Sequence, residues 1–288
     1  MNLNKNTLSD FLKTTFPGSK VKFIEEGWGS IAFVVDDNIV RFPKEGIGDY
    51  EKEKLLTNYV REYVDVSLPK IQIFENSLYK YAMHKMLEGN SWNVENICSL
   101  PANRKELFIK DCATFLAKIH SIDISAIKKL SPTLEYKPAE NIPFEGVEPY
   151  ICHSFSNDDL SRLKRQYESA YKEEIEDIVF SHRDFSGSNS LIDDNYKLTG
   201  VFDWGNSNLS ERAYEFHRLY NPDYIGFLEQ LLNEYSKLSN ATVNIDRVKN
   251  ISLMDTITSA YWVNVCEDMA KMKDKEMKWI IKKLRWFL

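Results

Sequence analysis

Apolar and polar residues alternate in short runs along the first third of the chain. Because a half-buried strand has a period of two, this pattern predicts strands, which we place at residues 21–24, 31–35, 39–42, 71–74 and 78–87. Between the third and fourth runs, residues 50–64 predict an amphipathic helix with Leu56 and Val60 on one face. An earlier helix is expected over residues 8–16, with Thr7 as its capping residue. The expected unit is a five-stranded antiparallel sheet with one inserted helix.

The remaining two thirds of the chain show mainly helical spacing of apolar residues. The pattern predicts helices, which we place at residues 102–120, 157–175, 214–220, 223–238, 245–265 and 271–287. Residues 130–156 carry four prolines and no clear period, so a loop is expected there. The chain is therefore predicted to be α+β, with an N-terminal lobe over residues 1–89 and a mainly helical C-terminal lobe over residues 90–288.

One segment of the second lobe carries a recognisable set of polar residues. Asp184 follows His182 at a spacing of two, Asn189 follows five residues later, and Asp203 comes after an apolar hairpin. Phosphoryl transfer needs a carboxylate to orient and deprotonate an alcohol, together with an Asn and an Asp that hold magnesium against nucleotide phosphates. We therefore expect Asp184 to be the catalytic base, and Asn189 and Asp203 to bind Mg²⁺ through hard oxygen atoms. His182 is expected to support the loop from below.

A glycine-containing turn between the first two predicted strands is a candidate phosphate loop. The sequence Gly27-Trp28-Gly29-Ser30 lets the backbone approach a phosphate, because glycine lacks the Cβ atom that would collide with it. Ser30 would then offer its backbone N–H and its hydroxyl to the phosphates. The alternative is a plain hairpin turn.

These motifs together resemble the aminoglycoside phosphotransferase family, whose pattern choline and homoserine kinases share more loosely. The strings HRDFSGSN and VFDWGN are similar to the catalytic and metal-binding loops of that family. Residues 115–123 resemble a helix end of the family, residues 26–33 its nucleotide loop, and residues 40–44 its third strand. The matching landmarks run from about residue 23 to about residue 220. The resemblance implies a bilobal, protein-kinase-like fold.

The resemblance also implies how a nucleoside triphosphate, ATP or GTP, would bind. Residues 85–89 look like the hinge of the family, so the carbonyl of Lys85 and the N–H of Leu87 would meet the base. His84 would either lie near that base or simply pack within its strand.

The usual phosphate-binding lysine of kinases is replaced by Arg41 in this sequence. Arginine keeps the positive charge and can bind phosphate through two N–H groups. We prefer Arg41 to Lys44 as the inward cation, because strand alternation places the neighbours of Arg41 on the other face. Its partner on the inserted helix is Glu53 or Glu51, and Glu53 shares the apolar face of that helix.

The acceptor side is expected to carry carboxylates if the substrate is an aminoglycoside, because its ammonium groups need anionic partners. Asn206 stands where many antibiotic kinases of the family have a second acid. Glu215 lies where the family often has an aspartate, and Glu267 and Asp268 are further candidates.

Composition agrees with an enzyme of the cytoplasm. The 288 residues include no apolar run of membrane-spanning length, and the N-terminus has no signal-peptide pattern. The four cysteines are widely spaced, which argues against disulfides and against a zinc site. The net charge of -6 disfavours nucleic acid as a partner and mildly favours a cationic substrate. We expect a monomer.

Three functional hypotheses follow. The first is a Mg²⁺-dependent kinase that phosphorylates a hydroxyl of an aminoglycoside antibiotic. The second is a kinase of an endogenous alcohol such as choline or homoserine, and the third is an inactive nucleotide-binding relative. A protein kinase is disfavoured, because neither a long activation loop nor an A-P-E-like segment follows Asp203.

Overall fold

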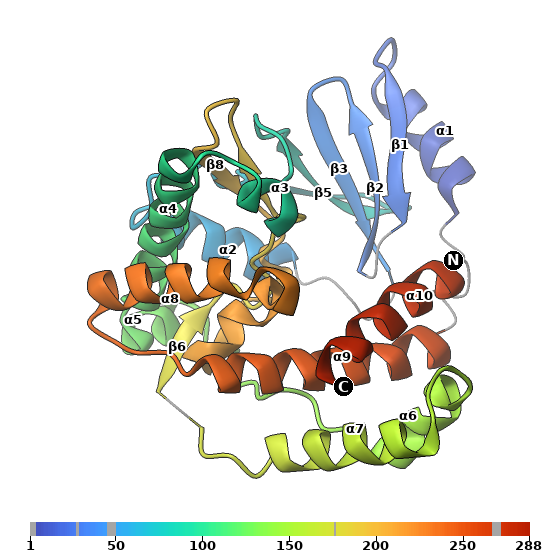
Figure 1. The fold of residues 1–288 in the computed structure, drawn as a ribbon. Coiled ribbons are helices and arrows are strands. Elements are labelled where there is room, and N and C mark those ends of the chain that lie inside the picture. The colour runs from blue at the N-terminus through green and yellow to red at the C-terminus, as the bar shows by residue number, and fades with distance from the viewer. Residues whose placement is uncertain (1–3, 27–28, 45–49, 176, 267–271) are drawn as a thin grey trace.

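The computed structural model describes residues 4–26, 29–44, 50–175, 177–266 and 272–288. Its N-terminal part is a sheet of five antiparallel strands in the order β1-β2-β3-β5-β4 (Figure 1). The bounds of these strands are β1 (Val21–Glu26), β2 (Ser30–Val35), β3 (Asn38–Pro43), β4 (Gln72–Glu75) and β5 (Lys80–Lys85). The predicted five-stranded sheet is therefore confirmed.

Two helices cover opposite faces of this sheet. On one face, α1 (Lys5–Thr15) buries Leu8 and Leu12 in a cluster that includes Phe42. The other face packs Ala82 against the first residue of α2 (Tyr50–Val60). The prediction of Thr7 as the N-cap of α1 was wrong. The N-cap is Asn4, whose side chain accepts hydrogen bonds from the backbone N–H groups of Asn6 and Thr7.

The alternation of β3 decides which cation faces α2. Val40 and Phe42 are fully buried on the α1 side of the sheet. Because successive side chains of a strand point to opposite faces, Arg41 points toward α2. Its cross-strand partner on that face is Ala82, which leaves room for a long side chain.

The rest of the chain is mainly helical and contains the largest apolar core. Its α-helices are α3 (Val94–Cys98), α4 (Ala102–His120), α5 (Ile124–Leu130), α6 (Phe144–Ile151), α7 (Asn157–Ala170), α8 (Ile225–Ser239), α9 (Ile245–Val265) and α10 (Lys273–Leu284). Short 3₁₀ helices add η1 (Cys152–Ser154), η2 (Trp204–Asn206), η3 (Arg212–Leu219), η4 (Pro222–Tyr224) and η6 (Arg285–Phe287). The central helices α4 and α9 have the predicted bounds.

Three expectations for this region were wrong in detail. The predicted loop at 130–156 contains α6, which turns Phe144, Val147 and Ile151 into the core despite Pro149. The helix predicted at 214–220 is the 3₁₀ helix η3, and α7 ends five residues earlier than expected. Apolar spacing over two short turns is too little to fix helix type or helix ends.

Two small strand pairs carry the loops of interest. The predicted hairpin is present as β7 (Ser190–Ile192) and β8 (Leu198–Val201). A second pair joins β6 (Ile178–Ser181) to β9 (Asn208–Glu211) and places Ser181 opposite Asn208. Residues 182–189 therefore leave one strand of this pair, and residues 203–207 enter the other strand beside it.

The segment that leads from the sheet to the helical part is hydrogen-bonded to the β7–β8 hairpin. Asn90 donates to and accepts from the backbone of Ile192. Gly89 has φ 129°, and a Cβ atom there would lie within 2.9 Å of Thr199 and Ile192 atoms. Only glycine fits both the conformation and the space. A division into lobes at this residue stays a prediction.

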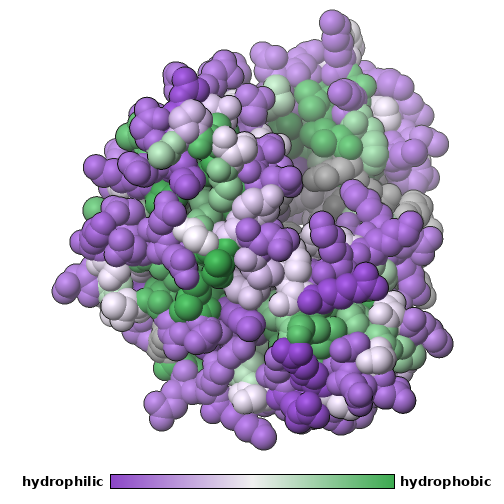
Figure 2. Space-filling model, viewed as in Figure 1, coloured by the Kyte–Doolittle hydropathy of each residue, from purple (hydrophilic) through white to green (hydrophobic). Residues whose placement is uncertain are grey.

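Polar residues cover most of the face seen in Figure 2, which is hollowed between the sheet and the helices below it. Within the described ranges, no helix is both long enough and apolar enough to cross a membrane.

A buried glycine fixes the middle of segment 182–189. The backbone carbonyl of Gly187 accepts from the N–H of Trp92, and the indole of Trp92 donates to Ser190 Oγ at 2.8 Å. A Cβ atom on Gly187 would collide with the carbonyl oxygen of Trp92. The segment can follow this path only with glycine at position 187.

We therefore expect Gly187→Ala to lower the free energy of unfolding by about 1–3 kcal/mol, the usual cost of overpacking. The matched control is Gly226→Ala, because a Cβ atom on this residue of α8 would meet nothing within 4 Å. The control should gain about 0.5–1 kcal/mol from the better helix former. Urea unfolding of both variants measures the difference, and equal stabilities would contradict the packing argument.

Candidate active site

His182 joins the segment that carries Asp184 to the one that carries Asp203. Its Nε2–H donates to the carbonyl of Phe202 at 2.9 Å, and its Nδ1 accepts from the N–H of Asp184 at 3.3 Å. The ring is fully buried and meets Trp204 edge-on. The expected supporting role of His182 is confirmed by these contacts.

Glu215 was expected to contact substrate, and this expectation was wrong. Its side chain is fully buried beneath the loop and accepts from the backbone N–H groups of His182 and Arg183. His120 Nε2 lies 3.5 Å from the same carboxylate. Burial alone would raise the pKa of Glu215, but the neighbouring His120 imidazole and the hydrogen bonds from the backbone N–H groups outweigh it and lower the pKa to about 2. Glu215 is therefore ionised and holds the loop from inside.

The backbone between His182 and Asp184 is strained. Arg183 has φ 69°, in the left-handed region that side chains other than glycine rarely adopt. Its guanidinium lies 4.0 Å from the ring centroid of Tyr214 and donates to the carbonyl of Lys137. These contacts, with the hydrogen bond that the Arg183 N–H donates to Glu215, keep Arg183 in a conformation that costs on the order of 1–3 kcal/mol.

Asn189 and Asp203 are brought close to Asp184 as predicted. The Asn189 side-chain N–H donates to the backbone carbonyl of Asp184 at 3.0 Å. The backbone carbonyl of Asn189 accepts from the N–H of Phe202, also at 3.0 Å. Asp203 has φ 63° and a side chain that is 51% exposed. Partial desolvation, and then the carboxylates of Glu53 and Asp184, raise the pKa of Asp203.

The donor set fits magnesium bound together with a nucleotide. Because the Asn189 amide nitrogen is turned to Asp184, its Oδ1 remains as a hard ligand beside the Asp203 carboxylate. The described ranges contain no group of three or more His, Cys, Asp or Glu side chains that could hold a metal. Magnesium suits such a site, because it keeps several waters and binds through one or two protein groups plus phosphates.

Arg41 reaches from the sheet toward these loops. Its Nη2 donates to Glu53 Oε2 at 2.8 Å, and its Nη1 lies 3.8 Å from Asp203 Oδ1. The ring of Tyr50 packs against the guanidinium at 5.1 Å. The expected ion pair with Glu53 is present, and it links the inserted helix α2 to the Asp203 loop.

The alternative choices for this pair fit less well. Glu53 is 2% exposed at the base of α2, whereas Glu51 points to solvent. Lys44 is also buried, and its backbone N–H donates to Gly29 at the entrance of β2. Arg41 and Glu53 form the ion pair that faces Asp203, and the choice of Arg41 over Lys44 as the phosphate-binding cation stays a prediction.

The predicted hinge follows β5. His84 is buried, and its Nδ1–H donates to the carbonyl of Lys85 at 2.9 Å. Burial lowers the pKa of His84 to about 4, so the ring is neutral near pH 7. His84 thus packs in its strand and also contacts the carbonyl expected to meet the base. The base contacts of Lys85 and Leu87, and the phosphate contacts of Ser30, stay predictions.

The matching family model is described as "APH: Phosphotransferase enzyme family", and it matches residues 20–247. This match covers most of the chain, including every loop described above. The chain belongs to the phosphotransferase enzyme family.

Solved structures share the fold of this phosphotransferase at low sequence identity. The GDP and kanamycin complex of APH(2")-IIIa has a TM-score of 0.75 and 18% identity, with 98% of each chain covered. The streptomycin–ATP complex of APH(2")-IIa has a TM-score of 0.61 and 19% identity, covering 100% of this chain and 99% of that chain. Macrolide 2'-phosphotransferase type I has a TM-score of 0.66 and 17% identity, covering 96% of this chain and 97% of that chain.

The surroundings of Asp184 contain a residue that the sequence did not single out. Arg218 of η3 places its Nε 3.1 Å from Asp184 Oδ1. No motif marks an arginine so far along the chain from Asp184, so its position needed the tertiary structure. Asn206 is exposed at the end of η2, and its role stays a prediction. Glu267 and Asp268 lie outside the described residues.

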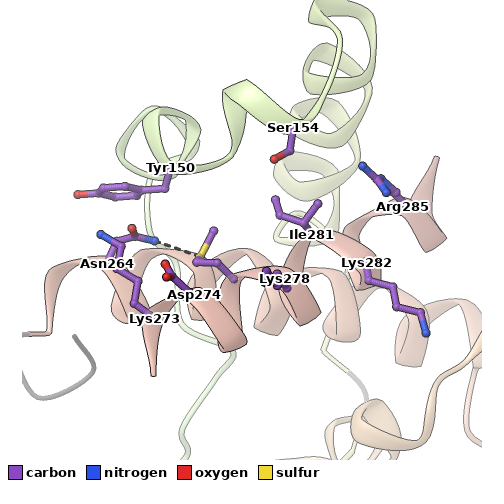
Figure 3. A pocket seen from close by; sticks show the side chains of 10 residues that line it. Tyr150, Ser154, Asn264, Lys273, Asp274, Lys278, Ile281, Lys282 and Arg285 are labelled. Carbon is purple, nitrogen blue, oxygen red and sulfur yellow. Dashed lines mark hydrogen bonds between the residues drawn. The ribbon is translucent and has the colours of Figure 1, made fainter. Parts of the chain in front are cut away.

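A pocket of about 520 Å³ lies between α6 with η1 and the α9–α10 pair (Figure 3). Tyr150 lines its α6 side, and Lys278, Lys282 and Arg285 contribute positive charge from the opposite side. Asp274 is the acidic residue among those that line it. This pocket contains none of the predicted site residues, and its charge does not suit a polycation.

The role of Glu215 predicts a pH-dependent contribution to stability. Its folded pKa is lowered from 4.5 to about 2, so the stabilisation is present above pH 4.5 and is lost as the pH falls toward 2. A shift of this size corresponds to roughly 3 kcal/mol. We expect Glu215→Gln to lower the free energy of unfolding by roughly that amount at pH 7, with a smaller difference at pH 3.

The matched control for this experiment is Glu229→Gln, which removes an exposed carboxylate from α8. It should match the wild type at both pH values, as is usual for a surface substitution. Urea titrations of all three proteins at pH 7 and pH 3 provide the measurement. A loss for Glu215→Gln that does not change with pH would mean that packing, rather than charge, explains its role.

Proposed function

We propose that the protein transfers the γ-phosphoryl group of a nucleoside triphosphate to a hydroxyl group of an aminoglycoside. The observation that carries this proposal is the convergence of Asp184, Asn189 and Asp203, with Arg41 facing Asp203. Such a set has a base, two metal ligands and a phosphate-binding cation, which are the parts that phosphoryl transfer requires. A protein that only bound nucleotide would gain nothing evident from the base.

The donor, ATP or GTP, would lie between the sheet and the helical part. Arg41 would bind its phosphates while Glu53 keeps the guanidinium in place. Ser30 would add its N–H and hydroxyl, and the backbone of Lys85 and Leu87 would meet the base. Mg²⁺, bound by Asn189 and Asp203, would neutralise the charge that develops on the phosphates.

Asp184 would act on the acceptor alcohol. Its carboxylate orients the hydroxyl so that the oxygen attacks the γ-phosphorus in line, and it takes the proton as the new oxygen–phosphorus bond forms. The bond from the γ-phosphorus to the oxygen that bridges it to the β-phosphorus breaks in the same step. The electron pair of that bond leaves with the nucleoside diphosphate.

An aminoglycoside is the acceptor that the fold comparisons favour. Neighbours that cover nearly the whole chain are complexes with kanamycin, gentamicin and streptomycin. The acidic net charge of -6 would attract such a polycation at long range. We place the enzyme in the cytoplasm, where nucleoside triphosphates are available, and propose that it acts as a monomer.

The test is an acceptor panel with purified protein, Mg²⁺, and either ATP or GTP. The panel contains kanamycin, gentamicin, streptomycin, a macrolide, choline and homoserine, and phosphorylated products are identified by mass spectrometry. Phosphorylation of an aminoglycoside alone supports the proposal. Transfer to the macrolide or to a small alcohol instead would reassign the acceptor, and no transfer with any acceptor would favour an inactive relative.

We expect Asp184→Asn to keep nucleotide affinity and to lower kcat by roughly 10²- to 10⁴-fold, the usual range for a general base. The amide still fills the same space but cannot accept the proton. Asp194→Asn, in the exposed turn before β8, is the matched control and should leave kcat unchanged. Steady-state kinetics with the best acceptor measures both. Near wild-type turnover in Asp184→Asn would remove the proposed base.

The charge and shape of Arg41 predict a graded series. Arg41→Lys should keep much of the activity, because a point charge still reaches the phosphates, whereas Arg41→Ala should raise the nucleotide KM and lower kcat. Glu53→Gln should cost little once Arg41 is already absent, because residues that share one role show non-additive losses. A kinetic double-mutant cycle measures this coupling. If Arg41→Ala leaves KM and kcat unchanged while Lys44→Ala loses most of the activity, the phosphate-binding cation is Lys44.

A further inference from the structure

A series of charged side chains leads from the proposed base into helix α9. Arg218 places its Nε 3.1 Å from Asp184 Oδ1 and its Nη1 3.5 Å from Asp255 Oδ2. Asp255 belongs to the middle of α9, and its side chain is 13% exposed. The Arg218 guanidinium thus lies between two carboxylates that come from different parts of the chain.

Asp255 is itself held firmly. Its other oxygen, Oδ1, lies 3.6 Å from His217 Nε2, so two adjacent residues of η3 meet one carboxylate. Burial alone would raise the pKa of Asp255, but Arg218, His217 and Lys283 outweigh it and lower the pKa. Asp255 is therefore ionised and provides a fixed negative charge behind Arg218.

Lys283 of α10 adds a buried positive charge whose field acts on this cluster. It is 2% exposed, and its ammonium lies 5.0 Å from the ring centroid of Trp279. Burial lowers the pKa of Lys283 to about 8, while Asp255 acts in the opposite direction. Burying several charges costs desolvation free energy, and the attraction within a buried ion pair often does not offset that cost. Such a cluster is better explained by what it positions.

The contact at Asp184 indicates what is positioned. Arg218 forms its ion pair with Oδ1, and no described residue forms an ion pair or hydrogen bond with Oδ2. The carboxylate is thereby fixed by one oxygen and keeps the other for an acceptor hydroxyl. A guanidinium released from Asp255 could turn its planar fork onto both oxygens of Asp184, since bidentate pairing is its preferred geometry with carboxylates.

We propose that Asp255 is a positioning residue for phosphoryl transfer: it holds Arg218 at one oxygen of Asp184 and so keeps the second oxygen for the acceptor hydroxyl. This inference rests on the proposed function, in which Asp184 is the base. It assigns to α9 a role in the chemistry, although that helix carries none of the recognised motifs.

The test compares Asp255→Asn with Asp246→Asn, which removes an exposed carboxylate from the first turn of the same helix. We expect kcat to fall by roughly 10- to 100-fold in Asp255→Asn, since misplacement by about 1 Å costs that order of rate. The nucleotide KM should stay within about twofold, and Asp246→Asn should match the wild type. Unchanged kcat in folded Asp255→Asn would overturn the proposal.

A kinetic cycle separates positioning from simple packing. Because Asp255 acts through Arg218, Asp255→Asn should cost little further kcat in an Arg218→Gln background. Arg218→Lys keeps the charge but lacks the planar fork, so it should lose kcat to a similar extent as Asp255→Asn. If Asp255→Asn does not fold, Arg218→Lys decides the matter. Additive losses in the cycle, or full activity of Arg218→Lys, would refute the positioning role.

A second cycle does not depend on finding an acceptor. Asp184→Asn and Asp255→Asn are combined, and the urea midpoints of the single and double variants are compared. Because both carboxylates share Arg218, their shifts should be non-additive. A wild type that phosphorylates no acceptor, together with non-additive shifts, would refute the proposed function and leave the charge network standing. Additive shifts would refute the network itself.

Discussion

The buried carboxylate of Glu215 is the constraint on which the proposed catalytic loop depends. The loop passes through Arg183 at φ 69°, a conformation that the chain would leave if it were not held. The buried Glu215 carboxylate accepts hydrogen bonds from the backbone N–H groups of His182 and Arg183. Without these bonds its negative charge would lack these hydrogen-bond donors in the core, which is costly. The strain at Arg183 and the burial of Glu215 therefore support each other, and both favour one position for Asp184.

Hydrogen bonds of His182 extend this constraint to the loop of Asp203, the proposed metal-binding side. Its ring bonds the carbonyl of Phe202, one residue before Asp203, and Asp203 again takes a left-handed φ. The pairing of β6 with β9 anchors the first loop at its start and the second at its end. The proposed base and metal ligands are thus positioned relative to one another by the backbone pairing of β6 with β9 and by the hydrogen bonds of the His182 ring.

Local patterns were enough to predict the sheet, the long helices and the places of the two loops that carry Asp184 and Asp203. The alternation around Arg41 also predicted which face it would take and that Glu53 would be its partner, because both periods can be counted along the sequence. The role of Glu215 could not be predicted in this way. The sequence does not distinguish a glutamate at the surface from one in the core. Glu215 is buried because η3 packs beneath a loop that lies more than thirty residues earlier in the chain. The same limitation applies to Arg218, which meets Asp184 and Asp255 only after distant segments assemble.

The arrangement places one arginine beside each of the two carboxylates proposed to act in phosphoryl transfer. Arg41 joins Asp203 to buried Glu53, and Arg218 joins Asp184 to Asp255. In each case one nitrogen meets an acid proposed to act in phosphoryl transfer, and another nitrogen meets an acid held by a helix. A lysine carries its charge at one point with three rotatable donors, whereas the planar guanidinium presents several donors in fixed directions and so holds two carboxylates at defined positions. As the proposed replacement of the usual kinase lysine, Arg41 preserves the charge and adds a rigid connection between α2 and the Asp203 loop. By the same reasoning, each arginine needs its second acid, because a guanidinium anchored at only one end would be free to close on the functional carboxylate.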